Sequence, residues 1–448
     1  MNKDYLIKLG TRKSGTASLK NKKNPVDRTA YMIENMDTNK AFVFLKGKNK
    51  QNESKLLQKF KNNFKTYREN WKKQPQTSIE NNFSPDDLKK KKIVPLCLDI
   101  EVAAICDLAC PFCYREFTTT PDKIINEKFC YDLIDQASEM GIPSIKFNWR
   151  GEPLMNPKLP NFIKYAKQKG ILDTMINTNA THLNKTLSEK IIKSGLDLIQ
   201  YSFDGGSKNT YEKMRPGRFK KNKFENVYEN IKNFKLIREK LGSKLPFTHI
   251  QMILTKETIN EVDNFFNLFG DIVDHVKVNQ YDERGGNISD LNERELTNYK
   301  NLLKKHNLPK GTQYMKDIFG NLTVSKGRLP CEQPFQRLMI TYEGRVGMCC
   351  MDWGAKHPVG YVNKKAFKNE NDYKKVMQNT KNEKKGYELL KKIKMPESFN
   401  KPLQKVERIR DVWFGKEISK VRDKHCTNKS EELEICKKCG FKEVYDWI

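Results

Sequence analysis

Short apolar runs alternate with longer amphipathic stretches from about residue 92 onward. Six runs have the length and flanking residues of β-strands: IVPLCLDIEV (93–102), SIKFNW (144–149), LDTMINT (172–178), LDLIQYSF (196–203), FTHIQMILT (247–255) and VDHVKVNQY (273–281). Helix-like segments separate them, with glycines where the helices should end, namely Gly141, Gly170, Gly195 and Gly270. This alternation predicts parallel strands with crossover helices, in an α/β sheet or an open barrel. In either architecture the functional groups lie at the C-terminal ends of the strands.

The pattern differs on both sides of this region. The first 90 residues are polar and lysine-rich, with one amphipathic helix predicted over LLQKFKNNFKTYRENW (56–71), whose aromatic residues should pack on the main body. A substrate-recognition role for this extension is the alternative. After about residue 310, LMITYEGRVGMCCMDW (338–353) predicts a β-hairpin that turns at Glu343 and Gly344. We therefore expect an N-terminal extension (1–90), a core domain (91–310) and a small cysteine-bearing C-terminal domain (311–448).

Composition narrows the possible partners and the compartment. The 448 residues include 84 Lys and Arg against 55 Asp and Glu, a net charge of +29, which invites a nucleic-acid interpretation. The lysines are scattered, however, and the chain lacks an extended basic arm or a recognised binding motif, so we do not expect a nucleic-acid partner. No run approaches the roughly 18 apolar residues of a membrane span, and the N-terminus lacks the apolar centre of a signal peptide. A cytoplasmic protein is expected.

Three of the eleven cysteines, Cys106, Cys110 and Cys113 in CDLACPFCYR, directly follow the first predicted strand. Tight clusters in a reducing compartment favour metal ligation over disulfides, and thiolates select zinc or iron–sulfur clusters. Both prefer four ligands, yet the next cysteine, Cys130, lies in a helix-like segment and is expected to be buried. A [4Fe–4S] cluster on three cysteines leaves one iron open for a chelating small molecule; zinc or inert thiols are the alternatives.

CxxxCxxC with an aromatic residue before the last cysteine resembles the signature of the radical S-adenosylmethionine (SAM) superfamily. NWRGEPLMNP (148–157) resembles the family's GGEP motif, INTNAT (176–181) its TNG motif, and YSFDGGSKNTYEKMRPG (201–217) its SxDG motif with a distal arginine. The resemblance spans roughly residues 92–290. It implies a partial (β/α)6 barrel of the TIM-like type, with a [4Fe–4S] cluster held by Cys106, Cys110 and Cys113.

The same resemblance implies how SAM would be bound. Its amine and carboxylate would chelate the open iron. Gly151 and Glu152 would meet the amine, Ser202 and Arg215 would receive the carboxylate, and Phe112 would lie near the adenine. Arg150 stands where the family usually has a glycine, which puts the local backbone geometry in doubt. No catalytic base is identified.

Six further cysteines form a second group: Cys331, Cys349, Cys350, Cys426, Cys436 and Cys439. Two from the flanks of the predicted hairpin and two from the closing CKKC would complete a tetrahedral site of four thiolates, for zinc or a fully ligated cluster. The region resembles the SPASM and twitch auxiliary-cluster domains. That resemblance implies a second [4Fe–4S] cluster on Cys331, Cys349, Cys436 and Cys439, with Cys350 and Cys426 expected to be buried rather than ligands or hydrogen-atom donors.

The resemblance implies an activity in turn. Reductive cleavage of SAM would give a 5′-deoxyadenosyl radical that abstracts a hydrogen atom from the substrate. With the second cluster as electron acceptor, the reaction would be a two-electron dehydrogenation of a sugar-like or cyclitol substrate. The closest alternative is modification of a peptide, and a further one is a non-catalytic iron–sulfur or zinc protein that binds RNA or a partner. A reductant such as flavodoxin or ferredoxin is an implied partner.

Overall fold

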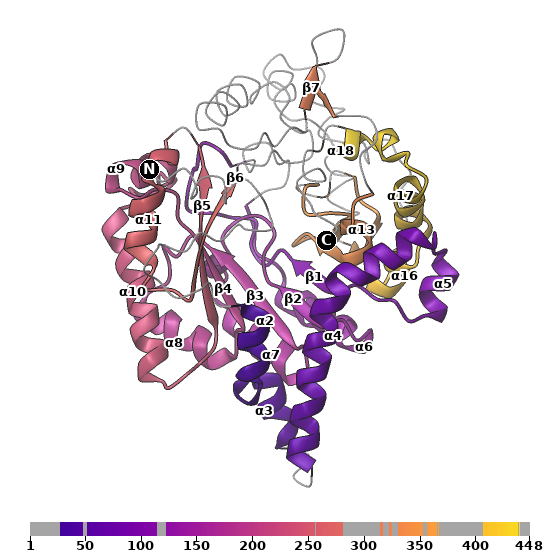
Figure 1. The fold of residues 1–448 in the computed structure, drawn as a ribbon, viewed down its shortest axis with the longest axis horizontal. Coiled ribbons are helices and arrows are strands. Elements are labelled where there is room, and N and C mark those ends of the chain that lie inside the picture. The colour runs from indigo at the N-terminus through magenta and orange to yellow at the C-terminus, as the bar shows by residue number, and fades with distance from the viewer. Residues whose placement is uncertain are drawn as a thin grey trace.

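The computed structural model describes residues 27–47, 52–113, 122–280 apart from 256, 314–316, 322–324, 330–366 apart from 353, 354, 356 and 365, and 406–439 apart from 438. Figure 1 shows helices around an open, curved sheet, with the C-terminal helices to one side. The fold is thus a mixed α/β architecture.

The six predicted strands all form, and they pair in parallel in chain order. They are β1 (Cys97–Ile100), β2 (Ser144–Lys146), β3 (Asp173–Thr178), β4 (Leu198–Ser202), β5 (Phe247–Leu254) and β6 (His275–Gln280). Each pairs with the next in register, for example Leu98 with Ile145 and Ile145 with Thr174. Because β6 forms an edge of the sheet, this is an open, partial (β/α)6 barrel, as predicted.

Helices cross between successive strands. They are α6 (Glu127–Glu139), η5 (Pro153–Met155), α7 (Leu159–Gln168), α8 (Lys185–Ser194), α9 (Lys208–Met214), α10 (Phe224–Lys240), η6 (Ile259–Glu261) and α11 (Val262–Phe269). Gly195 ends α8 in the left-handed region, at φ +92°, as its position in the sequence predicts. Cys130 is fully buried on α6, which confirms that it is a core residue.

The C-terminal region extends the same sheet. Its strands are β9 (Arg337–Ile340), β10 (Arg345–Gly347) and β11 (Gly360–Tyr361); β9 pairs in parallel with β1, and β10 pairs antiparallel with β9. The predicted hairpin is confirmed, with Gly344 in its turn at φ +106°. The other elements are β7 (Tyr314–Lys316), β8 (Leu322–Val324), α13 (Gln333–Gln336), α16 (Ile409–Trp413), α17 (Lys416–Cys426), η8 (Ser430–Glu432) and α18 (Glu434–Lys437).

Most of the N-terminal helices lie at the end of the barrel where the strands begin, and the last of them lies beside the C-terminal helices (Figure 1). They are α2 (Arg28–Glu34), η2 (Met36–Thr38), α3 (Lys40–Lys46), α4 (Glu53–Glu80) and α5 (Pro85–Lys90). Phe60, Phe64 and Tyr67 on α4 are buried in a cluster with Leu96, Leu172 and Leu245, as the predicted packing requires. Asp173, the first residue of β3, accepts a hydrogen bond from Arg28 at 2.5 Å. The extension therefore closes the barrel at the end opposite the cysteine loop.

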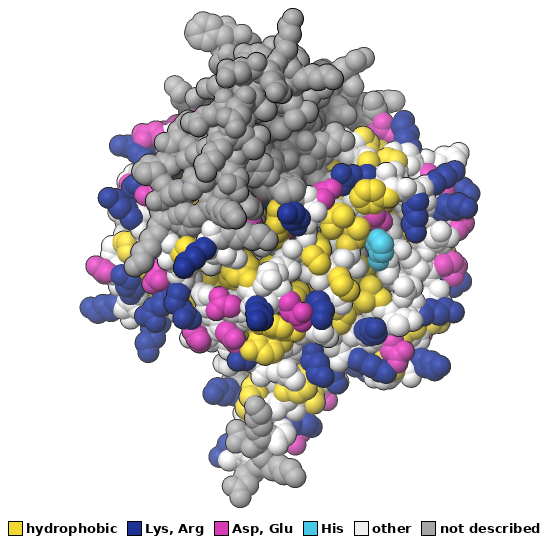
Figure 2. Space-filling view, turned by 180° about the vertical axis from the view of Figure 1, so that it is seen from behind, with side chains coloured by type: hydrophobic (Ala, Val, Ile, Leu, Met, Phe, Trp, Pro, Cys, Tyr) yellow, Lys and Arg dark blue, Asp and Glu magenta, His cyan; other side chains and the backbone are white. Residues whose placement is uncertain are grey.

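On the face seen in Figure 2, charges of both signs are interspersed. Figure 2 shows Lys and Arg side chains dispersed over the described part of one face, with Asp and Glu among them. No helix within the described ranges is both long and apolar enough to cross a membrane.

Candidate functional site

The predicted cysteine loop lies after the C-terminal end of β1. It is tied to the loop after α9, because Ala109 N donates to Pro216 O at 2.9 Å and Arg218 N donates to Asp107 O at 2.7 Å. Cys113 N donates to Cys110 O at 3.0 Å, which makes a tight turn in the loop. The segments that follow β1 and β4 therefore contact each other, as expected for the C-terminal ends of parallel strands.

Among the described residues no three Cys, His, Asp or Glu side chains converge closely enough to hold a single metal ion. The assignment of Cys106, Cys110 and Cys113 therefore rests on their spacing and their shared loop. Burial raises the pKa of Cys110 to about 12, and the positive charge of Arg215 opposes that rise. A cluster must displace the thiol protons as it binds, which is the usual requirement for thiolate ligands.

Gly151 provides a close approach between the loop after β2 and the cysteine loop. Its φ is +66°, and a Cβ there would lie 2.3 Å from Ala103 O and 2.7 Å from Ile105 O. The left-handed conformation falls on Gly151 and not on Arg150. Arg150 instead forms a buried ion pair with Glu101, so its departure from the family pattern leaves the glycine geometry intact.

Glu152 follows Gly151 and is buried at the mouth of β3. Its Oε1 accepts hydrogen bonds from Leu154 N (3.0 Å) and Thr178 Oγ1 (2.7 Å), and its Oε2 accepts one from Asn179 N (2.8 Å). Burial raises the pKa of Glu152 to about 7, although these hydrogen bonds favour the charged form. A carboxylate accepts about four hydrogen bonds, so Oε2 retains acceptor capacity toward a cationic ligand.

Arg215 and Phe112 come together, as two of the predicted SAM contacts should. The guanidinium carbon of Arg215 lies 5.7 Å from the centroid of the Phe112 ring. Arg215 is held in place by Asp204, which accepts from Nε at 2.8 Å and from Nη2 at 2.5 Å. Ser202 is placed differently: its hydroxyl accepts a hydrogen bond from Gln251 on β5 at 3.4 Å.

A polar group beside Cys106 was missed by the sequence reasoning. Asp107 accepts hydrogen bonds from Asn179 Nδ2 (2.9 Å) and Thr181 Oγ1 (2.7 Å), and Asn179 Nδ2 lies 3.8 Å from Cys106 Sγ. Burial acts to raise the pKa of Asp107, but hydrogen bonds from His182, Thr181 and Asn179 lower it to about 2. The sequence does contain a signal for this polar group, since INTNAT places Asn179 and Thr181 at the end of a predicted strand.

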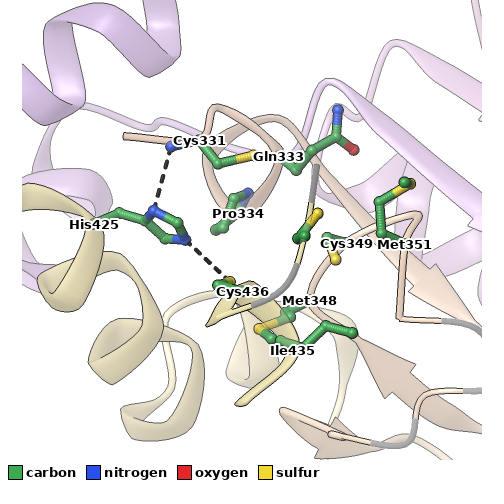
Figure 3. A pocket seen from close by; sticks show the side chains of 10 residues that line it. Cys331, Gln333, Pro334, Met348, Cys349, Met351, His425, Ile435 and Cys436 are labelled. Carbon is green, nitrogen blue, oxygen red and sulfur yellow. Dashed lines mark hydrogen bonds between the residues drawn. The ribbon is translucent and has the colours of Figure 1, made fainter. Parts of the chain in front are cut away.

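The second group of cysteines surrounds one cavity. All four predicted ligands, Cys331, Cys349, Cys436 and Cys439, line it together with Gln333, Pro334, Met348, Met351, His425 and Ile435. Figure 3 shows Cys331 at the start of α13, Cys349 after β10 and Cys436 on α18. Four thiols from three separate segments around one cavity fit the donor set of a fully ligated iron–sulfur cluster.

The two remaining cysteines of this group do not line the cavity. The expectation that both are buried is wrong, because Cys350 and Cys426 are each half-buried. Cys426 ends α17, and its partial burial raises the pKa of its thiol to about 11. Cys350 is half-buried, and its carbonyl accepts a hydrogen bond from Trp149 Nε1 at 3.2 Å. That contact joins the loop after β2 to the C-terminal hairpin, and thus connects the surroundings of the two cysteine groups.

Two family models match the chain. One, described as the radical SAM superfamily, matches residues 100–269, which hold the cysteine loop and the predicted SAM contacts. The other, SPASM, described as an iron–sulfur cluster-binding domain, matches residues 331–389. The first implies a [4Fe–4S] cluster and SAM, and the second implies auxiliary iron–sulfur clusters. Cys436 and Cys439 lie beyond the second match.

Curated relatives match parts of the chain. A GTP 3′,8-cyclase of Chlorobaculum tepidum is 32% identical over 106 residues, which are 23% of this chain and 32% of the cyclase. A PqqA peptide cyclase of Granulibacter bethesdensis is 30% identical over 111 residues, 24% of this chain and 29% of that enzyme. The chain therefore spans about a third of the length of each of these relatives.

Solved structures are similar at low identity. BtrN in complex with AdoMet and 2-DOIA is 14% identical, with a TM-score of 0.40 over 77% of this chain and 93% of that chain. SuiB of Streptococcus suis bound to the precursor peptide SuiA is 18% identical, with a TM-score of 0.44 over 70% of this chain and 68% of that chain.

Proposed function

The chain belongs to the radical SAM superfamily and carries a SPASM domain C-terminal to its radical SAM domain, and from this premise we propose that it catalyses a two-electron oxidation of a small hydroxylated substrate. The dehydrogenation of a sugar-like or cyclitol alcohol is the reaction we favour. When bound, the first cluster and SAM together supply a 5′-deoxyadenosyl radical that takes a hydrogen atom from the substrate.

The observation that supports the proposal is that Gly151 and Glu152 contact the segment leading into the cysteine loop, and that Arg215 lies beside Phe112 of that loop. Gly151 lets the loop after β2 approach the carbonyl groups of the cysteine loop, and Glu152 presents a carboxylate there. We assign the amine of SAM to Glu152, because a buried carboxylate with remaining acceptor capacity suits an ammonium group.

Arg215 is assigned to the carboxylate of SAM. Asp204 engages its Nε and Nη2 atoms, which directs the guanidinium, and the Phe112 ring lies beside it. Arginine suits this task because its planar group presents donors in a fixed geometry. Burial of Glu152 and Arg215 also keeps water from the reacting centre, which a radical reaction requires.

The second cysteine group supports a role in electron transfer rather than in substrate binding. With four protein thiolates an iron–sulfur cluster has no iron left open to a substrate, so its remaining function is electron transfer. We therefore assign to it the acceptance of the electron of the substrate radical, whose hydroxyl proton is released to the medium as the alcohol becomes a carbonyl group. A flavodoxin or ferredoxin is the proposed reductant for the first cluster.

The N-terminal helices support a small substrate over a peptide. They pack on Leu96, Leu172 and Leu245, each of which directly precedes or lies close before a barrel strand. This places α2, α3 and the first half of α4 at the end of the barrel away from the cysteine loop, while Gln74 in the second half of α4 donates a hydrogen bond to Phe335 O of α13. Their described contacts therefore give them a structural role, and the peptide-modifying reaction remains the second candidate that the experiment must address.

The experiment is an anaerobic assay of the reconstituted enzyme. With dithionite and SAM we expect 5′-deoxyadenosine, and Cys110→Ala should abolish it. A panel of aminocyclitols, aminosugars and short peptides is then added, each deuterated at carbon, and deuterium in 5′-deoxyadenosine identifies the substrate class. Transfer from a peptide alone would select the peptide reaction. No 5′-deoxyadenosine from a fully loaded enzyme would instead favour a non-catalytic binding protein.

A further inference from the structure

His425 lies between two of the four cysteines that line the second cavity. The backbone N–H of Cys331 donates to His425 Nδ1 at 3.2 Å, and His425 Nε2 lies 3.7 Å from Cys436 Sγ. Figure 3 shows the imidazole bridging the segment before α13 and the start of α18. The side chain is buried, with 1% of its surface exposed.

These two contacts determine the tautomer of the imidazole. A backbone N–H can only donate, so Nδ1 must be the acceptor and carry no hydrogen. A neutral imidazole with a bare Nδ1 carries its hydrogen on Nε2, which faces Cys436 Sγ. In this tautomer Nε2 has no lone pair for iron, so His425 is a hydrogen-bond donor to the sulfur and not a fifth metal ligand.

We propose that His425 is a positioning residue that donates a hydrogen bond to the sulfur of Cys436 and thereby raises the reduction potential of the second iron–sulfur cluster. The inference rests on the ligand set given under the proposed function. A hydrogen bond to a thiolate ligand withdraws negative charge from it, and so stabilises the reduced, more negative cluster relative to the oxidised one.

A neighbouring contact on the same helix supplies a matched control. Arg422 lies one turn before His425 on α17, and its Nε donates to Pro334 O at 3.0 Å. Its guanidinium also stacks on Trp413, with 4.0 Å between the guanidinium carbon and the ring centroid. Both residues thus dock α17 on the segment that carries Cys331, but the described contacts of Arg422 reach no sulfur atom.

The test is a potentiometric titration of the full-length chain, monitored by electron paramagnetic resonance. Replacement of Cys106, Cys110 and Cys113 by alanine leaves the second cluster as the source of the signal. His425→Phe should favour the oxidised cluster about tenfold, a fall in midpoint potential of 59 mV for one electron, since a hydrogen bond to a charged group has about that strength. His425→Gln retains a donor and an acceptor and should restore most of the potential. Arg422→Lys should lower thermal stability and leave the potential unchanged.

The outcomes separate this inference from the proposed function. If about four irons are retained in His425→Phe at an unchanged potential, His425 does not tune the cluster, although the ligand set stands. If the variant in which the first three cysteines are replaced by alanine binds no second cluster, the ligand set itself is wrong. If His425→Phe loses its iron, hyperfine spectroscopy is carried out on the reduced variant in which Cys106, Cys110 and Cys113 are replaced by alanine. An exchangeable proton coupling that His425→Gln alters supports the inference. The absence of such a coupling overturns it.

Discussion

Arg150 donates two hydrogen bonds to the carboxylate of Glu101, from Nε at 2.5 Å and from Nη2 at 2.7 Å. Both side chains are buried, and Glu101 Oε2 also accepts a hydrogen bond from Tyr342 N at 3.1 Å. The pair therefore connects three segments: the end of β1, the loop before Gly151 and the C-terminal hairpin.

Removal of one partner of this pair should strongly destabilise the fold. Arg150→Met leaves the Glu101 charge buried without its partner, and we expect a loss of about 3–5 kcal/mol in the free energy of unfolding. The double variant Glu101→Gln with Arg150→Met keeps an acceptor for Tyr342 N and should lose clearly less. Urea denaturation of the three proteins measures both values; equal losses in the single and double variants would contradict the role of the pair.

Two glycines with similar positive φ angles should respond differently to alanine. Gly141 has φ +73° and nothing within 4 Å of a Cβ, whereas a Cβ on Gly151 would lie 2.3 Å from Ala103 O. Gly141→Ala should therefore cost only the strain of a left-handed residue, about 1–2 kcal/mol. Gly151→Ala must push the loop after β2 off the cysteine loop, so we expect SAM binding to be lost. Calorimetric titration of SAM into both reconstituted variants provides the comparison, and tight binding by Gly151→Ala would refute the assigned loop geometry.

Substitution of Arg215 by lysine should weaken SAM binding while the cluster is retained. The single ammonium group of lysine cannot donate to Asp204 and to a ligand carboxylate with the planar geometry of a guanidinium. The loss of one hydrogen bond to a charged group corresponds to about a tenfold increase in the Kd of SAM. Arg218→Lys is the control, because Arg218 pairs with the half-exposed Asp122. Equilibrium binding and iron content are measured together; an unchanged Kd in Arg215→Lys would show that SAM is held elsewhere.

In the second group, substitution of a cysteine that lines the cavity should lower the iron content, and substitution of a cysteine outside the cavity should not. Cys436→Ala is expected to remove about four irons and the corresponding sulfide, and to leave the first cluster in place. Cys426→Ala, ten residues earlier and outside the cavity lining, should retain the full iron content. Iron loss in Cys426→Ala with none in Cys436→Ala would reassign the ligands.

Two histidines should make stability fall in mild acid. His249 on β5 and His275 on β6 lie side by side, with 2.9 Å between their Nδ1 atoms. Burial, with the neighbouring charge of Lys277, lowers the pKa of His275 to about 4, and burial and His275 lower the pKa of His249 well below its usual value. The unfolded chain therefore binds more protons between about pH 6.5 and 4, so the stability present above pH 6.5 is lost as the pH falls through that window.

This pH dependence is checked by denaturation at several pH values. His275 alone should contribute up to about 3 kcal/mol across the window. His275→Gln should flatten the decline, whereas substitution of the exposed Lys190 should leave it unchanged. A wild-type decline that His275→Gln does not alter would assign the acid sensitivity to other groups.

The sequence predicted most of the barrel, because each strand and helix is encoded by its own local pattern. Residues 247–255 and 273–281, for example, became β5 and β6 with only their ends shifted. The helix predicted over 56–71 extends from Glu53 to Glu80 and includes Pro75, which no local propensity indicates. The pairing of β9 with β1 was also not predictable, since it depends on contacts between segments more than 230 residues apart.

The functional site was likewise predictable where local motifs encode it, and not where it depends on contacts between distant segments. The cysteine spacings and the arginine after the SxDG motif led to residues that the structure brings to one end of the barrel or around one cavity. Asp107 and His425 were missed, because each acts through a partner that is distant in the sequence. Asp204 lies in the SxDG motif, but its pairing with Arg215 was not predicted. A single histidine in KVRDKHCTNKS resembles any residue on a charged helix until the fold places it beside Cys331.

The pairing of β9 with β1 determines where the chain can be divided. Leu98 pairs with Ile145 of β2 on one side and with Leu338 of β9 on the other, Ile100 pairs with Ile340 of β9, and β1 is buried along its length. A truncation that ends before β9 would turn β1 into a bare, apolar edge strand, the kind of surface on which chains aggregate. We therefore expect the core and the C-terminal cysteine domain to fold, and to be expressed, only as one unit.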